Sequence, residues 1–170
     1  MDPGLVHLTK LSHFHISFPI MEAKATQSAL NSLITVLKDG QKGYADAMTD
    51  VKDQHLKDLF KKYSAQRASY ITELEDQMFK LDLHPETNEG SSIVGAIHHA
   101  WIDLKSAVTG HDNHAILAEC ERGEDVAKKA YEEAGKIQDL PSDLKSIIEK
   151  QSQGILAAHN EIKALRDSSN

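Results

Sequence analysis

The chain has 170 residues, of which 40% are hydrophobic and 26% are charged, and its formal net charge is −7. This length suits one domain with a substantial core, and the composition is typical of a soluble globular protein. The negative charge argues against binding to nucleic acid or to an anionic membrane surface. No apolar run approaches the length that a bilayer-spanning helix requires.

Cys120 and the first residues bear on where the protein works. Because Cys120 is the only cysteine, an intrachain disulfide is excluded and a reducing compartment is expected. We interpret this cysteine as a small buried residue. Residues 1–21 lack helical periodicity and the basic segment and cleavage site of a secretory signal. They are predicted to form a flexible extension, and a metal held by His7, His13 and His15 is the less favoured interpretation.

Two long amphipathic helices follow this extension. Apolar residues recur every three or four positions over about residues 25–50 and again over about residues 53–81, which predicts one helix in each range. Asp53 is predicted to cap the second helix. Because the connection between the helices is short, they should form an antiparallel hairpin.

The second half of the chain begins with a predicted loop, PETNEGSS, and then returns to helical periodicity. Residues 92–108 are predicted to form a shorter amphipathic helix with Trp101 as its core anchor. Two longer helices follow, over about residues 112–137 and 141–166, with the sequence DLPSD between them. This short connection predicts a second helical hairpin.

No segment shows sustained strand alternation, so the predicted fold class is all-α. The two antiparallel hairpins are joined by one long crossover, which carries the extra amphipathic helix. This connectivity is the ferritin-like form of a four-helix bundle. We assign residues 22–167 to this single domain and residues 168–170 to a frayed tail.

Each long helix places one polar side chain within its apolar stripe. These inward residues are Gln41, Arg67, Glu124 and His159. A carboxylate on the buried face of a helix is unfavourable unless a partner neutralises it, so we predict that Arg67 pairs with Glu124. Gln41 and His159, with tyrosine hydroxyl groups, are predicted to complete the hydrogen bonds of this buried polar network. Four tyrosines can supply those hydroxyl groups: Tyr44, Tyr63, Tyr70 and Tyr131.

The chain resembles a bacterial family of small four-helix-bundle proteins, domain of unknown function 2383, in several segments that include LNSLITVLKDGQKGY and AAHNEIKALRD. The segments HHAWIDLKSAVTG and ECERGED carry most of the resemblance, which extends over about residues 30–167. It implies a ferritin-like fold and a bacterial origin, and it brings no established activity.

The ferritin-like superfamily holds two metal ions in mid-bundle, with a glutamate from each of two helices and a Glu-x-x-His motif from each of the other two. This chain departs from that pattern, because Leu156 stands three residues before His159 and because the permanent cation Arg67 would repel a metal. We therefore expect no cofactor. Iron or manganese is the alternative, with Glu121, Glu124 and His159 as candidate ligands.

The predicted function is that of a non-enzymatic, cytoplasmic bundle protein associated with stress, which acts through a homo-oligomer such as a dimer or through a protein partner. Two alternatives remain open. One is a metal-binding oxidoreductase or iron-handling protein of the ferritin type, which needs about four inward carboxylates. The other is a small-molecule-binding bundle that uses its polar core as a pocket. Neither nucleic acid nor a membrane is expected as a partner.

Overall fold

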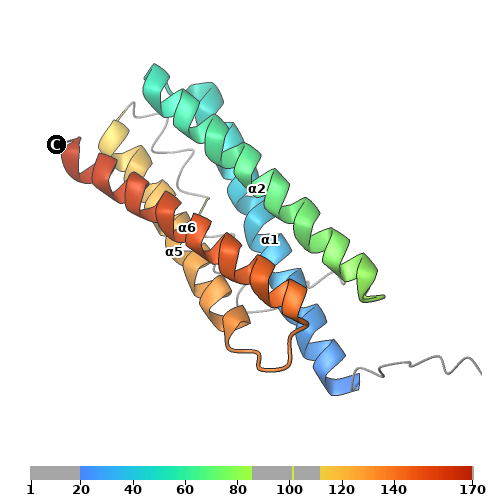
Figure 1. The fold of residues 1–170 in the computed structure, drawn as a ribbon. Helices are drawn as coiled ribbons and strands as arrows, with labels where there is room; N and C mark the ends of the chain where they lie inside the picture. The colour runs from blue at the N-terminus through green and yellow to red at the C-terminus, as the bar shows by residue number, and fades with distance from the viewer. Residues whose placement is uncertain (1–19, 86–100, 102–111, 170) are drawn as a thin grey trace, which may run out of the picture.

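The computed structural model describes residues 20–85, 101 and 112–169. Four helices make up this part of the chain (Figure 1): α1 (Ile20–Asp50), α2 (Gln54–Lys80), α5 (Asn113–Gly135) and α6 (Ser142–Ser168). The described segments contain no strand, and the all-α prediction is confirmed. The helix predicted over residues 92–108 lies outside the described residues, with the exception of Trp101.

The helix boundaries follow local sequence signals. Asp53 caps α2 as predicted, because its side chain accepts a hydrogen bond from the backbone N–H of Leu56 at 3.1 Å. Asp112 caps α5 in the same way. Helix α1 begins at Ile20 rather than near residue 25, because the intervening sequence MEAK consists of good helix formers and places Glu22 in the first turn.

Hydrogen bonds near the helix ends fix the connectivity of the bundle. The side chain of Gln27 donates to the carbonyl oxygen of His84 at 3.0 Å, so α2 ends beside the beginning of α1. The side chain of Asn113 donates to Asp53 at 3.3 Å, so α5 begins beside the start of α2. The chain therefore leaves α2 at one end of the bundle and enters α5 at the other, as Figure 1 shows. This is the connectivity that a single long crossover produces.

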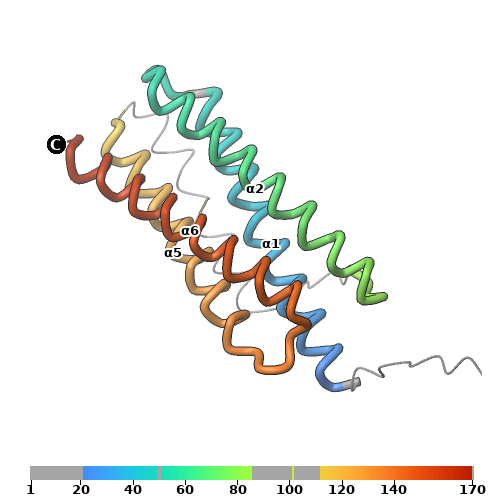
Figure 2. Tube along the Cα trace, viewed as in Figure 1, coloured from blue at the N-terminus to red at the C-terminus, as the bar shows by residue number. Residues whose placement is uncertain are grey.

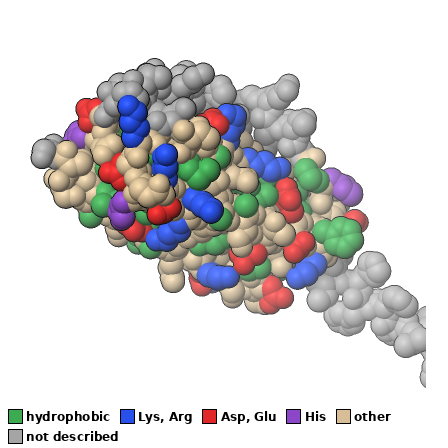
Figure 3. Space-filling view, turned by 90° about the horizontal axis from the view of Figure 1, so that it is seen from above, with side chains coloured by type: hydrophobic (Ala, Val, Ile, Leu, Met, Phe, Trp, Pro, Cys, Tyr) green, Lys and Arg blue, Asp and Glu red, His purple; other side chains and the backbone are tan. Residues whose placement is uncertain are grey.

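The four helices form a square in which α1 contacts α2 and α5, and α6 contacts α5 and α2. Helices α2 and α5 therefore lie on one diagonal, and Figure 2 shows the hairpins α1–α2 and α5–α6 side by side. On the face drawn in Figure 3, acidic and basic side chains are interspersed. Among the described helices, none combines the length and the apolar character that crossing a bilayer requires.

The apolar core consists of two clusters, one in each half of the bundle. The half that holds the beginning of α1 contains Leu30, Leu33, Leu37, Leu74, Met78, Tyr131 and Ile148, among others. The other half contains Tyr44, Val51, Phe60, Ile116, Cys120 and Ile162, among others. Arg67 and Glu124 each lie along their helix between residues of one cluster and residues of the other, so these two buried charges lie near the middle of the molecule.

Candidate functional site

Two charged side chains face each other across the centre of the bundle. Arg67 lies on the inner face of α2 between Tyr63 and Tyr70, and Glu124 lies on the inner face of α5. Each residue is only 1% exposed. Arg67 Nη2 donates to Glu124 Oε1, so the two side chains form a buried ion pair along the diagonal of the bundle. The Arg67–Glu124 contact, predicted because each residue lies within an apolar stripe, is therefore present.

Tyr44 and Gln66 hydrogen-bond to this pair, and we call Arg67, Glu124, Tyr44 and Gln66 the charged layer. Glu124 Oε2 is buried without a hydrogen-bond partner among the described residues. The Tyr44 hydroxyl donates to Glu124 Oε1 at 2.5 Å, and Arg67 Nη1 donates to Gln66 Oε1. The guanidinium carbon of Arg67 also lies 5.9 Å from the ring centroid of Tyr44 and 5.9 Å from that of Tyr63. A cation near aromatic rings is stabilised by their electrons, so Arg67 has partners on several sides.

The protonation states within the charged layer are fixed by burial and by Glu124. Burial, followed by the nearby Glu124 carboxylate, raises the pKa of Tyr44 well above its ordinary value, so its hydroxyl stays protonated and donates. Burial alone would lower the pKa of Arg67, but the charge and hydrogen bond of Glu124, together with the nearby Tyr44 and Tyr131, outweigh burial and the pKa of Arg67 is raised. Burial likewise raises the pKa of the Cys120 thiol, which fits a small core residue and not a nucleophile.

Two predicted members of the network, His159 and Tyr70, have their contacts outside the charged layer. His159 lies beside a different pair of carboxylates on α5. The Tyr70 hydroxyl lies against α6, where a Cβ added at Gly154 would stand 2.0 Å from it. Gln41 is half-buried, and its backbone carbonyl oxygen accepts a hydrogen bond from the Ser64 hydroxyl. The physical reason is geometric: an inward position on a helix reaches only the groups at its own height and on its own side of the bundle.

His159 instead belongs to a second cluster between α5 and α6. Its Nε2 lies 2.9 Å from Asp125 Oδ1 and 3.8 Å from Glu121 Oε1. Glu121 and Asp125 are one helical turn apart on α5, so they share a face. The metal set predicted from the sequence contained Glu124 where the structure places Asp125, because Glu124 is turned inward to Arg67. The spacing of Glu121 and Asp125 was the sequence signal that could have identified this cluster.

Trp101 covers the charged layer from the gap between α1 and α5. Its indole meets the Tyr44 ring edge-to-face, with centroids 5.2 Å apart. A Cβ added at Gly43 of α1 would lie 2.2 Å from the indole, and one added at Gly123 of α5 would lie 2.4 Å from it. Only glycines allow so close an approach. Trp101 is partly buried and packs against the core cluster, as an anchor of the crossover should.

A family model matches this chain over residues 25–137, and its description is domain of unknown function (DUF2383). The chain belongs to the DUF2383 family. DUF2383 is a ferritin-like domain family, which agrees with the helix connectivity described above. No curated protein sequence matches the chain.

The charged layer of this DUF2383 protein does not fit a ferritin-like di-metal centre. Such a centre takes about four carboxylates and two histidines from the four helices. In the described part of the bundle centre, Glu124 supplies a carboxylate, but its Oε1 is held by Arg67 and Tyr44. A guanidinium beside the carboxylate repels a metal cation and supplies no lone pair to it.

A third polar group in the DUF2383 chain is built around Gln151 of α6, which the predicted polar network did not include. The Tyr131 hydroxyl donates to Gln151 Oε1 at 2.7 Å, and Gln151 Nε2 donates to Glu73 at 2.8 Å and to the carbonyl oxygen of Tyr70 at 3.2 Å. Each side-chain atom of this buried amide therefore has a partner. Because buried amides are costly only when unsatisfied, this group stabilises the contact between α2, α5 and α6.

The stability of the bundle should depend on pH through Glu161. Hydrogen bonds from Tyr63 and then Lys62 hold the pKa of Glu161 below its ordinary value of 4.5. A carboxylate with a lowered pKa in the folded state stabilises the fold above its unfolded pKa, and the contribution is lost as the pH falls through the folded pKa. Because solvent screens this exposed carboxylate, the effect should stay below about 1 kcal/mol.

The measurement compares wild type with Glu161→Gln by urea unfolding at several pH values. The difference in free energy of unfolding should be complete at pH values well above the ordinary pKa of 4.5 and should vanish as the pH falls through the lowered pKa of the folded state. Glu149→Gln, at an exposed position of the same helix, is the control and should show little difference at any pH. A difference between wild type and Glu161→Gln that stayed constant over the whole range would contradict this assignment.

Proposed function

We propose that this DUF2383 protein is a non-enzymatic, ferritin-like bundle in which the charged layer takes the structural place of a di-metal centre. The observation that carries the proposal is the guanidinium of Arg67 on Glu124 in the middle of the core. In a di-metal bundle the cations neutralise inward carboxylates. Here a side-chain cation does so, and it needs no metal supply.

The charged layer would specify how the two hairpins assemble. Arg67 belongs to the first hairpin and Glu124 to the second, and the pair joins helices on opposite corners of the square. A shift of one hairpin along the other would separate the charges and leave both buried without a partner, which costs several kcal/mol. We therefore assign the charged layer a role in fixing the alignment of the hairpins.

Function in such a protein would be exercised at its surface, through a second copy of the chain or another protein. Two large apolar side chains support this view, since Met21 and Phe79 are each 87% exposed. Both lie at the end of the bundle where α1 begins and α2 ends. Scattered exposed apolar residues are common, so the oligomeric state has to be measured directly.

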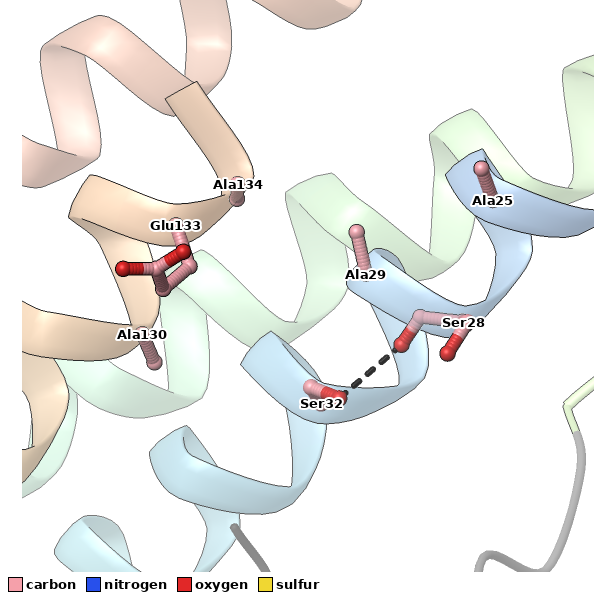
Figure 4. Close-up of a pocket in the computed structure, with 7 residues that line it drawn as sticks. All are labelled: Ala25, Ser28, Ala29, Ser32, Ala130, Glu133 and Ala134. Carbon is pink, nitrogen blue, oxygen red and sulfur yellow. Dashed lines mark hydrogen bonds between the residues drawn. The ribbon is translucent and has the colours of Figure 1, made fainter. Parts of the chain in front are cut away.

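The small-molecule alternative receives less support. The groove described in this structure lies between α1 and α5, near the beginning of α1 and the end of α5 (Figure 4). Its lining residues are Ala25, Ser28, Ala29, Ser32, Ala130, Glu133 and Ala134. None of them belongs to the charged layer, so this groove offers no route for a ligand into the polar core.

Elemental analysis tests the proposal. The full chain, purified without a histidine tag, is loaded aerobically with iron or manganese, and the metal content of wild type is compared with that of Glu124→Gln. We expect no bound metal that depends on Glu124. Glu132→Gln, at an exposed position of the same helix, is the control. About two metals per chain, lost in a folded Glu124→Gln protein, would overturn the proposal and favour a ferritin-type oxidoreductase.

The association part of the proposal is tested separately by the native mass of the tag-free protein. A mass of twice the 18.8 kDa chain is expected for self-association. Phe79→Ser and Met21→Ser should shift the protein toward the monomer if that end of the bundle forms the interface. A wild-type protein that is monomeric at high concentration would exclude the homodimer.

A further inference from the structure

We propose that Glu121, Asp125 and His159 form a mononuclear site for a divalent transition metal between α5 and α6. The site does not rest on the function proposed above, because it uses neither Arg67 nor Glu124. It also differs from a di-metal centre, since it is built on two helices and lies at their edge. Ligand atoms from the three residues all lie within 4.8 Å of one another.

The geometry of these atoms is close to that of a metal-bound set. Carboxylate and imidazole ligands stand about 2.0–2.2 Å from a zinc ion, which puts neighbouring ligand atoms about 3–4 Å apart at tetrahedral angles. His159 Nε2 is 2.9 Å from Asp125 Oδ1 and 3.8 Å from Glu121 Oε1. Only small side-chain shifts would admit an ion. The Asp125 side chain is 57% exposed, so water can approach from its side and fill the remaining coordination position.

The environment of the His159 ring points to a cation. Its Nδ1 lies 3.2 Å from Asn160 Oδ1, and its Nε2 faces the two carboxylates. A neutral imidazole has one N–H. When Nδ1–H donates to Asn160, the lone pair of Nε2 is directed to the two carboxylates, where a metal ion can accept it. The side chain of His159 is 9% exposed, so little of the ring is open to solvent.

Outer contacts orient the ligands as they do in known metal sites. Arg166 Nη1 holds Glu121 Oε2, which leaves Oε1 directed to His159. Asn160 holds the other nitrogen of the imidazole. Groups that bind the far atoms of metal ligands fix ligand orientation. The positive charge of Arg166 beside Glu121 and that of Lys128, whose Nζ stands 4.0 Å from Asp125 Oδ1, also reduce the attraction of the carboxylates for a cation, so the orientation of the ligands has to outweigh this repulsion. Two carboxylates and one imidazole suit zinc, manganese or ferrous iron.

Calorimetric titration of the tag-free full chain with Zn²⁺ tests this site. We expect a site with one ion per chain whose affinity falls at least about tenfold in His159→Gln and in Asp125→Asn. His55→Gln and Asp58→Asn, at exposed positions of α2, are matched controls and should bind as wild type does. Each variant changes one residue and retains the other histidines of the chain, so their background binding is nearly the same in wild type and in the variants.

Two further readouts separate the metal site from a salt bridge. Zn²⁺ should raise the melting temperature of wild type and of Asp58→Asn but not that of Asp125→Asn. Co²⁺ should give visible absorption bands that His159→Gln removes. Glu124→Gln, if folded, should keep the site, which distinguishes it from a metal in the bundle centre. Equal Zn²⁺ binding by wild type, His159→Gln and Asp125→Asn would overturn the proposal.

Discussion

Replacing Arg67 with methionine should lower the free energy of unfolding by about 3–5 kcal/mol, because Glu124 is then a buried charge without a counterion. Methionine keeps most of the volume of the arginine stem, so lost packing contributes little. The Tyr44 hydroxyl would be the remaining donor to Glu124 within the described core. Urea unfolding followed by circular dichroism measures the change.

A double-mutant cycle separates the ion pair from other effects of the substitution. Adding Glu124→Gln to Arg67→Met should recover much of the lost stability, since the amide is uncharged and its oxygen can still accept from Tyr44. Lys38→Met is the control: Lys38 forms an exposed ion pair with Glu75, and such pairs contribute at most about 1 kcal/mol. A stability of Arg67→Met equal to that of wild type would disprove a structural role for the ion pair.

The Arg67–Glu124 contact was predictable because few charged residues lie on the inner faces of the helices, so each has few possible partners. The apolar stripes give each helix an inner face, and a buried carboxylate requires a cation at that face. Arg67 is the one arginine within the apolar stripes of these helices, so it could be assigned to Glu124 without knowledge of the angles at which the helices pack. The two hairpins were also predictable, because two long helices joined by a short connection can only pack side by side in antiparallel directions.

The surroundings of His159 could not be predicted in the same way. Glu124 and Asp125 are adjacent in the sequence, but successive residues of a helix point about 100° apart. Whether His159 meets one or the other depends on how α6 is rotated and how far it is shifted along α5. Periodicity gives the inner face of each helix but not its rotation against a neighbour. The sequence therefore grouped His159 with Glu124 as well as with Glu121, whereas the structure places Asp125 and Glu121 beside it.

The glycine contacts of Trp101 were missed for a related reason. Trp101 was predicted to be the anchor of the crossover, but no residue that contacts it was predicted. The residues that make room for the indole are Gly43 and Gly123, from helices in different halves of the chain. Their common role exists only once α1 and α5 lie side by side. A glycine within a helix signals close approach, but it does not identify what approaches.

Replacing Gly43 or Gly123 with alanine should displace Trp101 from its position over the charged layer. The new methyl group would stand 2.2 Å or 2.4 Å from indole atoms, well inside van der Waals contact. Overpacking of this kind costs about 1–3 kcal/mol, whereas alanine in place of glycine favours a helix by about 1 kcal/mol. The net change in the free energy of unfolding should therefore be a loss of up to about 2 kcal/mol.

The fluorescence of Trp101, which is the only tryptophan of the chain, reports its displacement directly. Emission should shift to longer wavelength and iodide quenching should increase in both alanine variants, while Gly135→Ala should leave both unchanged because nothing lies within 4 Å of the added Cβ. The double variant Gly43→Ala/Gly123→Ala should lose much less than the sum of the single losses. Once the first methyl group has displaced the indole, the second no longer meets it and only improves the helix. Strictly additive losses with unchanged emission would mean that the indole does not lie between these glycines.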